Sequence, residues 1–137
     1  AKLPAPPNPS NLIEFFGGKL TQNHFFVDSE SIDVGTDGVV RYTQVVRTEG
    51  GATNVTFEGM RCSTSEMRLY AIGGRDGIWT EARDSRWKPV NVGATKNRNH
   101  GVLARDVFCP DHSPVRNKAE AIRNLKQSFQ ARERTLY

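Results

Sequence analysis

The chain has 137 residues, and Lys and Arg outnumber Asp and Glu by 19 to 15. This length fits one domain with a sizeable core, and the interspersed charged and apolar residues exclude a disordered chain. No apolar run approaches the ~20 residues that a membrane-spanning helix needs, so we expect a protein that does not span a membrane.

The first ten residues contain four prolines and predict an extended arm. Cuts by signal peptidase fall after small residues, so the start at Ala1 favours a chain whose signal peptide has been removed, although a trimmed chain would begin in the same way. The apolar stretch 11–16 fits one helical turn or a strand. We expect residues 1–22 to form this arm and lead-in, and residues 23–137 to form one globular domain.

Strand-like segments separated by turn residues fill the middle of the chain. In the segment 39–48 apolar and polar residues alternate as in a half-buried strand, with Val40, Tyr42 and Val46 on one face. In the following segment the apolar residues change parity at Gly59, which predicts a β-bulge there. Short turns join the segments, so we expect an antiparallel meander of about five strands.

The pattern changes in the last third of the chain. Residues 91–101 are polar and predict a loop, and 102–109 fits a strand or a short helix. Ser113-Pro114 then predicts the start of a helix of about 18 residues. One stripe of this helix is apolar, with Val115, Ala119, Ile122, Leu125 and Phe129 at helical spacing. The expected fold class is therefore α+β, a meander with a C-terminal amphipathic helix packed on it.

Cys62 and Cys109 are the two cysteines, and neither lies in a Cys-x-x-Cys pair. A zinc or thiol-redox motif therefore has no support. An even cysteine count permits one disulfide, and two buried free thiols are the alternative. A Cys62–Cys109 bond would close a loop of about 47 residues and stabilise the domain by ~4 kcal/mol through chain entropy.

Several short stretches resemble the CNP-one-like family of uncharacterised exported bacterial proteins. They are FFVD at 25–28, VGTDGVVRYT at 34–43, NVTFEGMRC at 54–62, RLYA at 68–71, DGIW at 76–79, Trp87, and FCP at 108–110. The resemblance implies export to the bacterial envelope, which favours the disulfide. It implies no reaction and no catalytic residue.

The carboxylates available to a hydrolase are Glu58, Glu66 and Glu81. Arg61 and Arg68 lie close enough in sequence to neutralise the first two, and a carboxylate beside an arginine is a poor general acid. Cross-strand ion pairs are the favoured interpretation here, and a polar pocket for a small ligand is the other.

The three histidines, His24, His100 and His112, are scattered along the chain, and only Asp111 adjoins the last. Zinc needs three or four converging ligands, so we interpret these histidines as surface groups and expect no metal. An oxidised Cys109 cannot act as a nucleophile. We therefore expect no catalytic residue and no cofactor.

The candidate binding residues are Trp79, Arg83, Arg86 and Trp87. Two indoles near two guanidinium groups suit a groove for a sugar ring or an aromatic ligand. Packing of the indoles over the open end of the sheet core is the alternative interpretation.

The charge is uneven, because from Arg83 onward twelve basic residues face five acidic ones. A solvated helix face explains this as well as an anionic partner does, and without aromatic residues for base stacking we expect no nucleic acid. The sequence favours a non-enzymatic binding domain, periplasmic or envelope-associated, whose partner is an envelope protein or an anionic envelope component. The alternative function is a carboxylate-dependent hydrolase that acts on envelope polymers.

Overall fold

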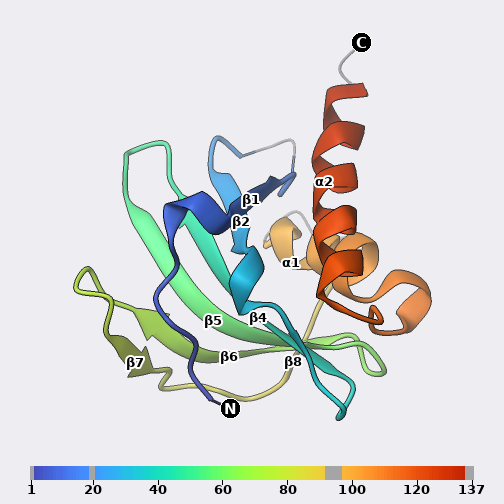
Figure 1. The fold of residues 1–137 in the computed structure, drawn as a ribbon. Helices are drawn as coiled ribbons and strands as arrows, with labels where there is room; N and C mark the ends of the chain where they lie inside the picture. Colours follow the sequence, from blue (N-terminus) through green and yellow to red (C-terminus); the bar gives the residue numbers. More distant parts are fainter. Residues whose placement is uncertain (1, 19–20, 92–96, 135–137) are drawn as a thin grey trace.

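The protein is an antiparallel sheet with a helical layer on one side, in a computed structural model that describes residues 2–18, 21–91 and 97–134 (Figure 1). The strands run in the order β1-β2-β4-β5-β6-β7, and two short strands extend it, β3 beside β4 and β8 beside β6. Their bounds are β1 Leu12–Phe15, β2 His24–Asp28, β3 Asp33–Val34, β4 Val39–Arg47, β5 Thr53–Arg61, β6 Glu66–Gly73, β7 Trp79–Glu81 and β8 Lys88–Pro89. The α+β class is confirmed, although the described residues form more than the predicted five strands.

The helical layer begins earlier in the chain than the sequence indicated. The predicted loop 91–101 is wrong in its second half, because α1 (Arg98–Val102) begins there and continues as a wider π-helical segment, η3 (Leu103–Phe108). A short turn, η4 (Pro110–His112), leads towards the C-terminal helix α2 (Lys118–Arg134). This helix starts after the predicted Ser113, because Asn117 Oδ1 accepts the Glu120 N–H over 2.9 Å and acts as its cap.

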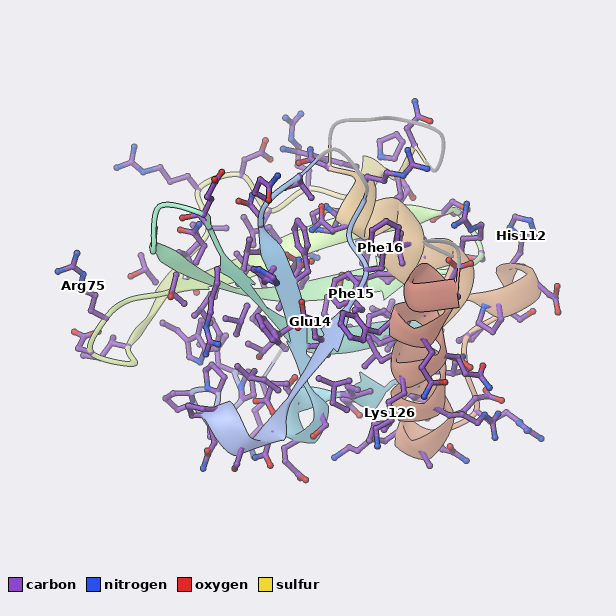
Figure 2. All side chains as sticks on the ribbon, turned by 90° about the horizontal axis from the view of Figure 1, so that it is seen from above. Glu14, Phe15, Phe16, Arg75, His112 and Lys126 are labelled. Atoms are coloured by element: carbon purple, nitrogen blue, oxygen red, sulfur yellow. A yellow bond between two sulfur atoms is a disulfide. The ribbon has the colours of Figure 1, made fainter. Side chains whose placement is uncertain are left out.

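The core lies between the sheet and these helices. Helix α2 packs on β1, at the edge of the sheet, and on η3. Tyr42 of β4 stacks on Phe108 of η3 with 4.4 Å between ring centroids, and both side chains are fully buried. Phe15 of β1 lies beside α2 in Figure 2, whereas Arg75 and His112 project away from the body. Ala121 and Leu125 of α2 are fully buried, whereas Ala119, which was predicted on the apolar stripe, is exposed. Helix α2 therefore seals one end of the core with part of the predicted stripe.

Leu125→Ala should destabilise the protein by ~2–5 kcal/mol, because Leu125 of α2 is fully buried against the core. Chemical denaturation followed by circular dichroism measures the change. Lys126→Ala, one residue further on the exposed side of α2, is the control and should change little. A Leu125→Ala variant as stable as the parent would contradict the packing of this stripe.

Strand β6 carries the one register shift between β5 and β6. Phe57 pairs with Ala71 and Glu58 with Leu69, so Tyr70 is the extra residue. The predicted bulge at Gly59 is therefore wrong, because the bulge lies on the neighbouring strand. Gly59 serves a different purpose, since a Cβ atom there would lie 2.8 Å from the Tyr70 ring. The bulge brings Leu69 to the same face as Glu58, because directly paired residues share a face.

The N-terminal arm lies against the other face of the sheet. Trp79 Nε1 of β7 donates a hydrogen bond to the Pro4 carbonyl over 2.8 Å, and Pro6 contacts the turn at Gly77. Figure 1 shows the arm leaving β1 and running down towards β7. The arm thus covers the side of the sheet that the helices leave open.

The structure contains the Cys62–Cys109 disulfide, with 5.3 Å between the two Cα atoms. Cys62 directly follows β5, and Cys109 directly follows η3. Both residues are buried. The bond therefore ties the helical layer to the end of the central strand that carries Glu58.

Candidate functional site

The carboxylate of Glu58 is the centre of a buried hydrogen-bond network, and its side chain is 3% exposed. Each of its oxygens has two partners. Tyr42 Oη donates to Oε1 over 2.8 Å, and His100 Nε2 lies 2.9 Å from the same atom. Thr56 Oγ1 donates to Oε2 over 2.6 Å, and Gln44 Nε2 donates to it over 3.0 Å. All four lone pairs of the carboxylate are thereby occupied.

Two strands and one short helix supply this network. Tyr42 pairs directly with Glu58, and Gln44 pairs with Thr56, so all four side chains leave the same face of β4 and β5. Helix α1 approaches that face and adds His100. It is held there by Asn99, whose Nδ2 donates to Gln44 Oε1 over 2.7 Å. Because Asn99 is itself buried, this bond fixes the position of the imidazole beside the carboxylate.

The electrostatics favour an ion pair between Glu58 and His100. Burial raises the pKa of Glu58, but the charge and hydrogen bond of His100, with those of Thr56 and Tyr42, outweigh it and lower the pKa. Burial lowers the pKa of His100, but the charge and hydrogen bond of Glu58 raise it above its ordinary value. Burial, followed by the charge of Glu58, raises the pKa of Tyr42 well above its usual range.

A cavity of about 420 Å³ opens against this pair, between β5, β6, the β8 segment and α1. Both His100, which is 20% exposed, and Glu58, which is 3% exposed, form part of its wall. The apolar part of the lining is Met67, Leu69, Pro89 and Val90. Three charged residues also line it, Asp84, Arg86 and Lys88. The cavity therefore combines an apolar wall, a buried charge pair and a charged group of residues.

The charges of Asp84, Arg86 and Lys88 compensate one another in part. Asp84 accepts from Arg86 Nε over 2.9 Å and lies 2.9 Å from Lys88 Nζ. The hydrogen bonds from Arg86 and then from Lys88 hold the pKa of Asp84 well below its usual range. Two cations against one anion leave an excess of positive charge beside the cavity.

The four binding residues predicted from the sequence occupy different places. Trp79 pairs with Gly73 at one end of β6, whereas Trp87 precedes the segment that pairs with Met67 at the other end. The Trp87 ring stacks under the Arg61 guanidinium, 4.3 Å from its centroid. Arg83 is exposed, and Arg86 lines the cavity beside Glu58. A groove shared by both indoles stays a prediction.

The carboxylates and histidines differ in part from their predicted surroundings. Glu66 does pair with Arg61, over 2.6 Å, but the partner of Glu58 is His100 and no arginine. His100 is thus not a surface group. His24 is exposed and pairs with Glu14.

Among the described residues, no three His, Cys, Asp or Glu side chains are placed to hold a metal ion. No described helix is long and apolar enough to cross a membrane.

The network was not predicted, although the sequence contains one signal of it. Gln44 falls on the apolar face of β4, between Tyr42 and Val46, and Glu58 shares a face of β5 with Met60. Polar residues on buried positions of adjacent strands need partners, so their coincidence indicates a buried polar site. The contribution of His100 had no such signal, because it lies 42 residues from Glu58 in the chain.

Comparisons with known proteins agree with the resemblance seen in the sequence. Cryptic neisserial protein 1 of Neisseria gonorrhoeae (strain ATCC 700825 / FA 1090) is 28% identical over 107 residues, which cover 69% of this chain and 52% of that protein. The chain thus spans about half the length of this curated relative. No solved structure matches the chain. A model of the CNP1-like family matches residues 1–126. The chain belongs to the CNP1-like family.

Proposed function

We propose that this chain is a non-enzymatic binding domain of the bacterial cell envelope, which holds a small amphipathic anion in the cavity beside Glu58 and His100. The observation that carries the proposal is the composition of that cavity. Its volume of about 420 Å³ lies in the range of small-ligand sites. Met67, Leu69 and Val90 suit an apolar body, and the excess of positive charge beside them suits an acidic group.

The state of Glu58 favours binding over hydrolysis. A general acid needs a raised pKa, and a nucleophile or base needs a free lone pair. Glu58 has a lowered pKa and four hydrogen-bond partners. The other carboxylate of the cavity, Asp84, is paired with Arg86 and Lys88 and also has a lowered pKa. The hydrolase is therefore the second candidate, supported by the presence of two carboxylates in one cavity.

The disulfide supports the envelope as the location. Disulfides persist in oxidising compartments such as the bacterial periplasm and are rare in the cytosol. The Cys62–Cys109 bond links the two layers that form the cavity wall. An anionic component of the envelope fits the charge of the cavity.

The fluorescent dye 8-anilinonaphthalene-1-sulfonate tests the proposal, because it combines apolar rings with one anionic group. The folded protein should enhance its fluorescence, and octanoate should displace it. Leu69→Trp should abolish the enhancement by filling the cavity, because Leu69 forms part of its apolar wall.

Ile72→Trp is the matched control for this experiment, because Ile72 is on the same strand but is 48% exposed and outside the cavity lining. This variant should keep the dye response, and circular dichroism should show that both variants are folded. A dye signal that Leu69→Trp leaves unchanged, or no signal at all, would refute the site.

A further inference from the structure

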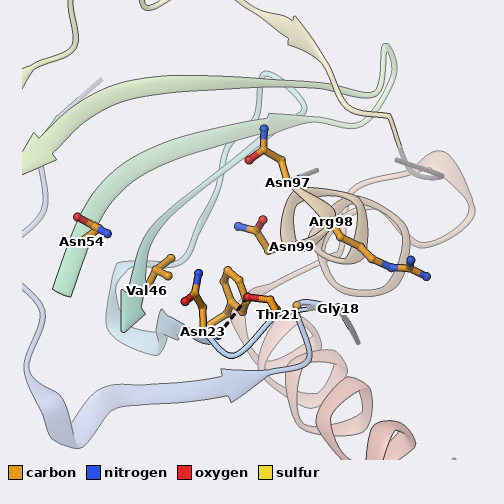
Figure 3. Close-up of a pocket in the computed structure, with 10 residues that line it drawn as sticks. Gly18, Thr21, Asn23, Val46, Asn54, Asn97, Arg98 and Asn99 are labelled. Atoms are coloured by element: carbon orange, nitrogen blue, oxygen red, sulfur yellow. Dashed lines mark hydrogen bonds between the residues drawn. The ribbon is translucent and has the colours of Figure 1, made fainter. Parts of the chain in front are cut away.

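A second cavity, of about 340 Å³, lies where the approach to β2, the ends of β4 and β5 and the start of α1 meet (Figure 3). Asn97 lines both this cavity and the one beside Glu58, so the two adjoin at the first turn of α1. Figure 3 shows side chains from these separate segments surrounding one hollow. The polar lining side chains are Thr21, Asn23, Asn54, Asn97, Arg98 and Asn99.

Amides dominate the chemistry of this lining. An amide side chain carries two donors and an acceptor, and a ligand hydroxyl is both donor and acceptor, so four asparagines match a hydroxyl-rich ligand. No carboxylate is among the described lining residues, and Arg98, which is exposed, is the one charged side chain among them. The amides outnumber this one exposed cation, so the lining favours an uncharged ligand.

Most of the hydrogen-bonding capacity of these amides is unused within the described part of the chain. Buried Asn99 donates to Gln44, and Thr21 Oγ1 accepts the Asn23 N–H over 3.1 Å. The side chains of Asn23, Asn54 and Asn97 form no hydrogen bond with another described residue. Asn23 is half-buried, and the other two are exposed. Three amides that pair with no other described side chain therefore surround the cavity from its inner part to its rim.

The remainder of the lining is apolar and is fixed by the local fold. Phe25 is buried and, with Val46, which pairs with it across β2 and β4, supplies the apolar side chains. Gly17 permits this placement, because a Cβ atom there would collide with the Phe25 ring. A sugar ring has both C–H faces and hydroxyl edges, and this cavity offers a partner to each.

We propose that this cavity binds an uncharged saccharide unit through the amides of Asn23, Asn54 and Asn97. This site is separate from the cavity beside Glu58, and the proposal does not depend on the binding of an amphipathic anion there. Its position beside the first cavity, with Asn97 in both linings, makes the face around α1 a surface with two ligand subsites.

Nuclear magnetic resonance tests the proposal, with maltotriose, cellotriose and N,N′-diacetylchitobiose as probes at millimolar concentration. At least one saccharide should shift the side-chain amide signals of Asn23 and Asn54. Asn54→Ala and Asn23→Ala should each weaken its binding by about three- to tenfold, as the loss of one hydrogen bond predicts. Gln127→Ala, on the exposed side of α2, is the control and should bind as the parent does.

Three results would overturn this inference. The first is that none of the three saccharides binds, and the second is that both asparagine variants bind as the parent does. The third is that inorganic phosphate shifts the same amide signals in place of the saccharides, because Arg98 would then be the recognising group. Leu69→Trp separates the two proposals, since it should block the dye but leave saccharide binding intact.

Discussion

Replacing both Cys62 and Cys109 by alanine should lower the free energy of unfolding by about 4 kcal/mol. The bond closes a loop of 47 residues, and its loss gives the unfolded chain more conformations. Both cysteines are also buried, so the two alanines leave space in the core. Urea denaturation of oxidised parent and double variant, followed by circular dichroism, measures the difference.

Reduction is the control for this prediction. Dithiothreitol should reduce the stability of the parent towards that of the variant, and it should leave the variant unchanged. Thiol titration of the denatured, unreduced parent should find no free thiol. Two free thiols in protein isolated from the periplasm would contradict the disulfide.

The strands were predictable from the sequence because alternation of apolar and polar residues is a local signal. The segment from Val39 to Arg47 shows it clearly, and it became β4. The bulge was predicted on the wrong strand, because the apolar residues of β5 change parity at Gly59 for a reason other than a bulge. Gly59 lies beneath the ring of Tyr70, a contact between strands that no local pattern encodes.

The helical layer was harder to predict, because contacts between residues distant in the sequence stabilise it. Residues 98–102 look like a loop because they are polar, yet they form α1. Their buried polar residue, Asn99, is satisfied by Gln44 from the sheet, 55 residues away in the chain. Tertiary hydrogen bonds thus stabilise a helix whose own sequence does not favour one.

Ion pairs between neighbours in sequence were easier to predict than the pair that the fold creates. The sequence predicted that nearby arginines would neutralise Glu58 and Glu66, and Arg61 does pair with Glu66, five residues away on a hairpin. The sequence could not pair Glu58 with His100, because the fold alone brings α1 to the face of β5. Buried polar positions such as Gln44 and Glu58 indicate that a partner exists, but the partner is found only in three dimensions.

Glu58→Ala should destabilise the protein by about 3–5 kcal/mol, because it removes one member of a buried ion pair. The variant also leaves the buried donors Tyr42 Oη and Gln44 Nε2 without their acceptor. Glu66→Ala is the matched control. Its carboxylate pairs with Arg61 at the surface, where solvent screens such a pair and it contributes little to stability. Similar losses for the two variants would contradict the buried network.

The ion pair also makes the contribution of Glu58 to stability depend on pH. Glu58→Gln tests this dependence, because glutamine has nearly the same shape as glutamate but carries no charge. The contribution of Glu58, whose pKa is lowered, is present above its ordinary value of 4.5 and is lost as pH falls through the lowered pKa. The contribution of His100, whose pKa is raised, is complete below its ordinary value of 6.5 and is lost as pH rises through the raised pKa.

The stability difference between parent and Glu58→Gln should therefore be greatest between pH 4.5 and 6.5 and should narrow on either side. Nuclear magnetic resonance titration of His100 provides the direct measurement. Its pKa should lie above 6.5 in the parent, where Glu58 outweighs burial, and below 6.5 in the variant, where burial acts without the opposing charge. An unchanged pKa for His100 in Glu58→Gln would show that the two side chains are not coupled, and His100 would then not join the cavity to the buried carboxylate.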